Sequence, residues 1–170
     1  MPEVMLILRG IAGNGKPKGQ LDEAPALEYA RRLGYVGEVL DVAGNTGAGS
    51  PQVRMALARI RDDEKDPVTA IYGFSGGGYN ARHIWAALNA SERADIDMVV
   101  VLGSPGVASE SFLGCENVII RGDPPAGHMA GPRVFLGSLG PEVASKPPER
   151  QSWGSAIAAA LRSIASWCKR

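Results

Sequence analysis

The sequence has little of the chemistry that metal sites and disulfides need. It contains two cysteines and two histidines in 170 residues. Cys115 and Cys168 have no closely spaced partner of the kind that zinc sites show, and they form no disulfide framework. We expect Cys115 to be a small buried residue and Cys168 to lie near the end of a helix. The cysteine pattern therefore favours a reduced, cytoplasmic protein without a metal centre.

The sequence also lacks an excess of charge of either sign and a long apolar run. Eighteen Lys and Arg residues balance eighteen Asp and Glu residues, so nothing favours nucleic acid or an anionic membrane as a partner. No run approaches the length that crosses a membrane, and residues 1–9 do not resemble a signal peptide. With apolar and charged fractions of 45% and 21%, the composition predicts one soluble domain over residues 1–170.

One stretch carries a specific chemical signal. Apolar residues 68–72 predict a buried strand, and Gly73-Phe74-Ser75-Gly76-Gly77 follows with the spacing G-x-S-x-G. Side chains two residues before and after the serine would collide in a sharp strand-to-helix turn, and glycine removes them. Ser75 is then presented above the carboxyl edge of the sheet, and the Gly76 N–H points toward a developing oxyanion. A purely structural turn or a phosphate-binding loop is the alternative.

The residues after this motif predict the helix that the motif requires. Apolar side chains recur at i, i+3, i+4 and i+7, at Ala81, Ile84, Trp85 and Leu88. In this strand–turn–helix context the chain resembles the α/β-hydrolase family, in which the serine is the nucleophile. The resemblance implies an acyl-transfer enzyme that uses neither a metal nor an organic cofactor.

The glycine-rich loop after a first predicted strand, residues 4–9, has one interpretation as a P-loop. Gly10, Gly15 and Lys16 have the G-x-x-x-x-G-K spacing of a nucleotide-binding loop. The next position should supply a hydroxyl to magnesium, but Pro17 has none. The missing hydroxyl weighs against nucleotide binding.

The hydrolase resemblance gives the same loop a different role. In that family the loop often begins with His-Gly and supplies the second oxyanion donor from its backbone. Arg9-Gly10 stands at the corresponding place here, and the resemblance makes the Ile11 N–H the donor, with Ala12 as the fallback. A flexible turn without chemistry is the remaining alternative.

The resemblance also identifies an acid and a base. Asp123 follows the predicted strand 117–121, where the family carries its catalytic acid, and His128 follows closely. The chain order Ser75, Asp123, His128 agrees with the family's order of nucleophile, acid and base. The alternative for residues 122–128 is a tight turn in which Asp123 accepts a hydrogen bond from its own backbone.

The position of the histidine departs from the family's pattern. Most members carry it after one further strand, which the sequence predicts at residues 133–136, beyond His128. The other histidine, His83, lies off the apolar stripe of the predicted helix, and we expect it at the surface. By elimination a base can only be His128, provided that its loop reaches Ser75.

The remaining segments complete the expected fold. They are a helix over 22–33 capped by Asp22, a strand over 35–42, a helix starting at Ser50-Pro51, a strand over 96–102, a loop over 137–151 and a helix over 152–168. This alternation predicts a three-layer α/β/α sandwich with a mostly parallel sheet of about six strands. The short connection from residue 102 to residue 117 leaves no room for a lid domain, so we expect an open site.

The sequence therefore predicts a serine hydrolase of small carboxylic esters or thioesters that works through an acyl-enzyme. Its expected triad is Ser75, Asp123 and His128, and the N–H groups of Gly76 and Ile11 form the expected oxyanion hole. The expected partner is a small-molecule ester substrate. A non-catalytic binding protein that retains the turn is the alternative, motivated by the displaced histidine. Nucleotide binding through residues 10–16 is a third hypothesis.

Overall fold

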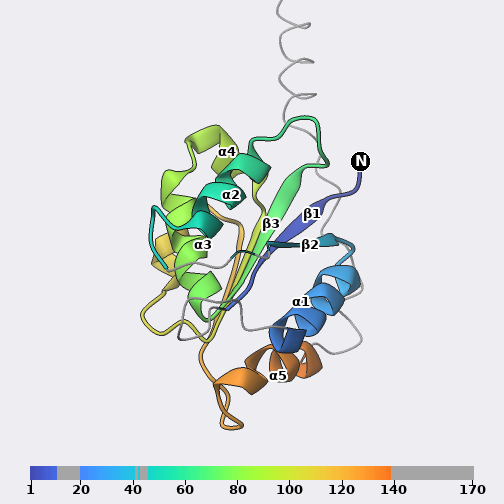
Figure 1. Ribbon diagram of the computed structural model, residues 1–170, viewed down its shortest axis with the longest axis vertical. Coiled ribbons are helices and arrows are strands. Elements are labelled where there is room, and N and C mark those ends of the chain that lie inside the picture. Colours follow the sequence, from blue (N-terminus) through green and yellow to red (C-terminus); the bar gives the residue numbers. More distant parts are fainter. Residues whose placement is uncertain (11–19, 41, 43–45, 139–170) are drawn as a thin grey trace, which may run out of the picture.

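A five-stranded parallel sheet is the centre of the fold. The computed structural model describes residues 1–10, 20–40, 42 and 46–138. The strands are β1 (Val4–Leu8), β2 (Val36–Leu40), β3 (Val68–Phe74), β4 (Met98–Leu102) and β5 (Asn117–Arg121). They pair in the order β2-β1-β3-β4-β5, and every pairing is parallel (Figure 1). The carboxyl ends of all five strands therefore meet at one edge of the sheet, where ligands bind in open α/β folds.

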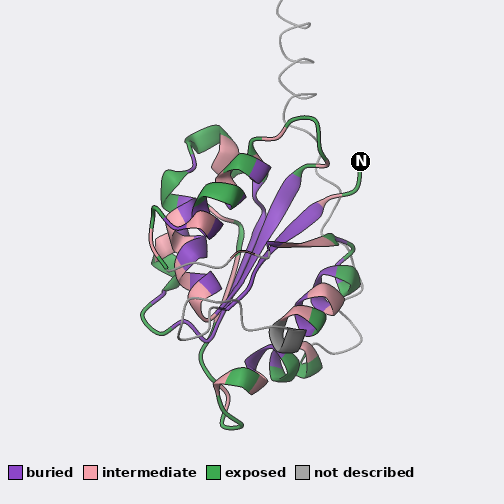
Figure 2. Cartoon of the chain, in the orientation of Figure 1, coloured by how far each residue is buried: buried purple, intermediate pink, exposed green. Residues whose placement is uncertain are grey.

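The burial of each strand follows from its place in the sheet. The inner strands β1, β3 and β4 are buried along their whole length (Figure 2), which explains their near-continuous apolar sequences. The edge strands β2 and β5 are partly exposed and carry charged residues such as Glu38 and Arg121. Charge on an edge strand discourages pairing with another chain.

Helices cover both faces of the sheet. On one face lie α1 (Gln20–Arg32) and α5 (Gly131–Ser138), and on the other α2 (Pro51–Ile60) and α3 (Gly76–Ala87), with the shorter α4 (Ala90–Asp95) beside them (Figure 1). Two 3-10 turns, η1 (Ser109–Phe112) and η2 (His128–Ala130), occur in the connections after β4 and β5. The arrangement is the predicted three-layer sandwich, with five strands in the described residues instead of about six.

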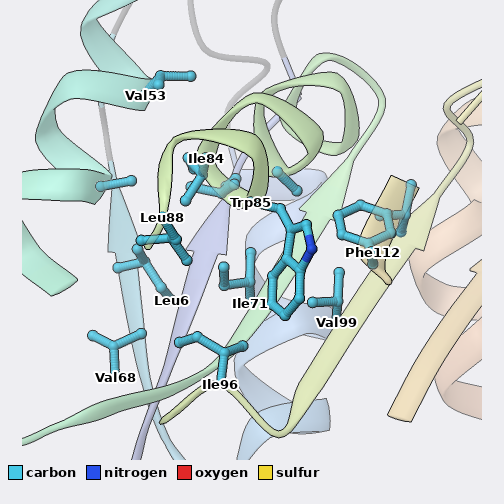
Figure 3. Packing of buried hydrophobic residues seen from close by; sticks show 14 of the residues in the cluster. Leu6, Val53, Val68, Ile71, Ile84, Trp85, Leu88, Ile96, Val99 and Phe112 are labelled. Carbon is cyan, nitrogen blue, oxygen red and sulfur yellow. The ribbon is translucent and has the colours of Figure 1, made fainter. Parts of the chain in front are cut away.

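Each face of the sheet has its own apolar core. Alternate residues of β3 serve the two cores, because successive strand side chains point to opposite faces. Ile71 packs with α3 residues such as Trp85, and Trp85 meets Phe112 of η1 edge to face, with ring centroids 6.1 Å apart (Figure 3). Tyr72 packs on the other face with Tyr29 of α1. Both cores anchor β3, the strand that leads into Ser75.

Two predictions about the helices were wrong. Residues 133–136 form no strand and belong to α5. The second residue of this helix, Pro132, suits a first helical turn. Its Phe135 packs on Tyr29, with ring centroids 5.1 Å apart. A short apolar run does not distinguish a strand from a buried helix by periodicity. Helix α1 begins at Gln20, so the predicted start at Asp22 was two residues too late.

Other predictions have clear outcomes. The helix start at Ser50-Pro51 is confirmed, since the Ser50 Oγ accepts a hydrogen bond of 3.2 Å from the Val53 N–H at the start of α2. Cys115 is partly buried, as a free thiol whose pKa is raised by burial. The predicted helix over 152–168, with Cys168, and most of the predicted loop over 137–151 lie outside the described residues. Among the described helices, none has the length and apolar character to cross a membrane.

Candidate active site

Ser75 occupies a strained turn between β3 and α3. Its backbone has φ 55° and ψ −118°, and it is the one non-glycine residue with positive φ in the described part of the chain. Such a conformation costs free energy and persists only where neighbouring structure enforces it. Here the Ser75 N–H donates to the Leu102 carbonyl at 2.8 Å, and the Ser104 Oγ donates to the Ser75 carbonyl at 2.6 Å. The end of β4 therefore holds the turn in place.

Three glycines make the turn possible. A Cβ on Gly73 would lie 2.7 Å from the Gly77 carbonyl oxygen, and a Cβ on Gly77 would lie 2.0 Å from the Leu8 carbonyl oxygen. A Cβ on Gly78 would meet the Ser104 Oγ at 2.1 Å. The predicted need for Gly73 and Gly77 agrees with these contacts. The role of Gly78 was missed, because it depends on β4, which is distant in the sequence.

Asp123 and His128 form a close pair after β5. The His128 Nδ1 lies 2.6 Å from the Asp123 Oδ1, and both side chains are partly exposed. With the proton on Nδ1, the imidazole donates to the carboxylate, which fixes the tautomer and directs Nε2 away from Asp123. The Asp123 carboxylate thus pairs with the imidazole, whereas the tight-turn alternative has Asp123 accept a hydrogen bond from its own backbone.

The loop that joins the two residues brings His128 back over the end of the sheet. The Gly127 N–H donates to the Pro124 carbonyl at 2.9 Å, and Gly127 adopts φ 95°, a conformation that glycine tolerates best. The chain then enters η2 at His128, directly before α5. A tight turn does exist here, and it serves to return the histidine toward the strand ends.

The Asp123–His128 pair lies against Phe74, which precedes Ser75, and close to Gly103 at the end of β4. The imidazole stacks on Phe74, with ring centroids 4.8 Å apart and an interplanar angle of 24°. A Cβ on Gly103 would lie 2.7 Å from the Asp123 Oδ1 and 3.0 Å from the His128 Nδ1. Phe74 precedes Ser75 in the chain, and Gly103 follows Leu102, whose carbonyl binds the Ser75 N–H. The structure thus pairs Asp123 with His128 and places the imidazole on Phe74, the residue before Ser75.

Of the two predicted oxyanion donors, Gly76 lies within the described residues and Ile11 does not. Gly76 is the first residue of α3, so its N–H belongs to the first turn of that helix, where backbone N–H groups have no intrahelical partner. Ile11 and its fallback Ala12 lie outside the described residues, as do Gly15 and Lys16 of the P-loop hypothesis. Arg9, at the end of β1, is buried, and its Nη1 lies 3.5 Å from Glu23 on α1.

Other features lie away from this site. His83 is half-buried on α3 and is more covered than the predicted surface position. No group of three or more His, Cys, Asp or Glu side chains in the described residues could hold a metal ion. A cavity of about 580 Å³ opens near the amino ends of β1 and β3, lined in part by Met1, Val68 and Thr69, and it shares no residue with the site.

Comparison with known proteins by sequence finds no match, and comparison by structure finds a distant likeness. No protein-family model matches the chain, and no curated protein sequence matches it. Among solved structures the chain is similar to a Trichoderma reesei cutinase in complex with a C11Y4 phosphonate inhibitor, with a TM-score of 0.44 and 16% sequence identity. The match covers 72% of this chain and 62% of the cutinase chain, so it spans less than two thirds of the cutinase.

Proposed function

We propose that the protein is a serine hydrolase that cleaves small carboxylic esters or thioesters through an acyl-enzyme on Ser75. One observation carries the proposal. A serine in a strained strand-to-helix turn, at φ 55°, is preceded by Phe74, on which the imidazole of an Asp–His pair with a 2.6 Å contact stacks. A nucleophile, a base and a group that orients the base are the parts that acyl transfer needs.

The proposed chemistry assigns one step to each residue. The Ser75 Oγ attacks the substrate carbonyl carbon while His128 Nε2 accepts its proton, and Asp123 stabilises the resulting imidazolium. The tetrahedral oxyanion receives hydrogen bonds from the Gly76 N–H and, as the sequence predicts, the Ile11 N–H. His128 then protonates the leaving alcohol or thiol. Water, deprotonated by His128, attacks the acyl-enzyme and releases the acid.

Labelling with a fluorophosphonate tests the proposal directly. The reagent should add to the wild-type protein once, detected by intact mass, and Ser75→Ala should abolish the addition because it removes the nucleophile. His128→Ala should slow the addition by at least about 100-fold, as expected for loss of a general base. His83→Ala is the matched control, because it removes the other histidine and should label at the wild-type rate.

Other labelling results would contradict either the hydrolase proposal or the role of His128 as the base. A wild-type protein that does not label contradicts the hydrolase proposal and favours the non-catalytic binding protein. Labelling that Ser75→Ala abolishes but His128→Ala leaves unchanged would mean that another group is the base. Addition of ATP with magnesium should not raise the Tm, whereas a nucleotide-binding protein would be stabilised by its ligand.

A further inference from the structure

Two buried amide side chains lie between α2 and α3. Asn80, on α3, is 0% exposed, and Gln52, on α2, is 1% exposed. Burying an amide costs free energy unless its hydrogen bonds are satisfied, and an apolar pair would fill the same space without that cost. The two residues are not part of the proposed triad. Their retention at the boundary of an apolar core therefore requires another explanation.

The hydrogen bonds of Asn80 fix its orientation. Its Nδ2 donates to the Gln52 Oε1 at 2.8 Å, and its Oδ1 accepts from the Gly47 N–H at 3.1 Å and from the Ser50 Oγ at 3.4 Å. Both ends of the amide are thus engaged with the chain that leads into α2. Asn80 belongs to α3, the helix that follows Ser75, so this network of hydrogen bonds ties α2 to α3.

The second end of Gln52 reaches the end of β1. The Gln52 Nε2 donates to the Arg9 carbonyl oxygen at 3.4 Å. A peptide group is planar, so the direction of the Arg9 carbonyl also sets the direction of the following Gly10 N–H. The first turn of α3 packs on the same backbone, since a Cβ on Gly77 would lie 3.1 Å from the Arg9 carbonyl oxygen.

We propose that Gln52 and Asn80 are positioning residues, which hold the backbone at the end of β1 in register with the helix that follows Ser75. The first turn of α3, which carries the Gly76 N–H proposed as an oxyanion donor, packs on this backbone, so the inference rests on the proposed hydrolase function. An apolar pair would fix the spacing of α2 and α3 but not the direction of a carbonyl. The amide network fixes both.

Two substitutions at one position test the inference. Gln52→Met keeps the approximate volume but removes both hydrogen bonds, and Gln52→Glu still accepts from Asn80 but, when ionised, cannot donate to the Arg9 carbonyl. Both should lower kcat for 4-nitrophenyl acetate by about 10-fold or more with little change in KM, because misplacement of a catalytic group by even 1 Å costs rate. Each rate is taken on protein shown to be folded by circular dichroism.

The pH dependence of Gln52→Glu separates positioning from a merely structural role. Burial raises the pKa of a carboxyl group. Once protonated, the new side chain can donate to the Arg9 carbonyl again. The ratio of variant to wild-type kcat should therefore rise as the pH is lowered, whereas the ratio for Gln52→Met should stay constant.

A control and the contrary outcomes complete the test. Tyr35→Phe removes a different buried hydrogen bond, from the Tyr35 Oη to the Asp97 Oδ1 at 3.1 Å, near the amino end of the sheet, and should leave kcat unchanged. If the wild type labels with fluorophosphonate but folded Gln52→Glu retains wild-type kcat at every pH, this inference is wrong and the proposed function stands. If the wild type does not label, both are wrong. Should Gln52→Met fail to fold, the nearly isosteric Gln52→Glu decides the matter alone.

Discussion

At the scale of single residues, Gly103 has an unusual double constraint. Its φ of 58° lies in the left-handed region that disfavours other residues. Its missing side chain also leaves the space that the Asp123–His128 pair occupies, since a Cβ would lie 2.7 Å from the Asp123 Oδ1. The backbone at the end of β4 and the proposed acid–base pair are therefore built against each other.

Gly103→Ala should lower kcat/KM for an ester substrate by about 100-fold, because the new methyl group displaces the pair that must face Ser75. Gly106→Ala is the matched control. Gly106 has a similar φ of 80°, but a Cβ there would meet nothing within 4 Å. Both variants should lose about 1 kcal/mol of stability from backbone strain, measured by urea unfolding. Equal activity in the two variants would contradict the placement of the pair.

At the scale of elements, the exposed side of α1 carries a charge cluster that makes the helix sensitive to acid. Hydrogen bonds from Arg31 and Arg32 lower the pKa of Glu28 from 4.5 to about 2. Because the Glu28 carboxylate binds a proton less readily in the folded state than in the unfolded state, its hydrogen bonds with the two arginines stabilise the fold above pH 4.5. That contribution is lost as the pH falls toward 2.

Glu28→Gln should therefore reduce the acid sensitivity of the fold. The thermal midpoint of the wild type should fall between pH 4.5 and pH 2 by more than that of the variant, and the two should differ most at neutral pH. The effect should be small and weaken with added salt, because the cluster is at the surface. Parallel pH profiles for the two proteins would contradict this assignment. The fluorophosphonate labelling rate at pH 7 should not change, since α1 carries no triad residue.

At the scale of the whole molecule, the two outer layers are coupled to the site by different contacts. Helix α3 begins directly at Ser75, so one layer carries the proposed nucleophile. On the other face, α5 follows η2, where His128 lies, and Phe135 of α5 packs on Tyr29 of α1. The proposed nucleophile, Ser75, is therefore held by the apolar core on one face of the sheet, and the proposed base, His128, by the apolar core on the other face.

Phe135→Ala should weaken both the fold and the site. Removal of this buried ring should lower the free energy of unfolding by about 3 kcal/mol and slow fluorophosphonate labelling of the folded protein, because α5 anchors the segment that carries His128. Val134→Ala is the control, since the neighbouring side chain is 47% exposed and its loss should cost less than about 0.5 kcal/mol. An equal loss in both variants would contradict the described packing of α5.

The sequence by itself was sufficient where the determining contacts are local. The turn at Ser75 was predicted from the G-x-S-x-G spacing: the collision that requires Gly73 arises within the turn itself, whereas the contact of Gly77 with Leu8 comes from β1, which is distant in the sequence. The start of α2 was predicted for the same reason, since Ser50 caps a helix that begins one residue later. The mostly parallel sheet followed from the alternation of predicted strands and helices along the chain.

The tertiary structure decided everything that depends on residues distant in the chain. The loop after β5 could be judged as a turn from its sequence, but only the folded chain shows that His128 stacks on Phe74 and that the Asp123–His128 pair lies close to Gly103. Residues 131–138 form a helix because Phe135 finds Tyr29 on α1, a partner that a short apolar run does not reveal. The Gln52–Asn80 pair joins residues 28 positions apart, and amides carry no periodic signal, so only the folded chain shows that they meet.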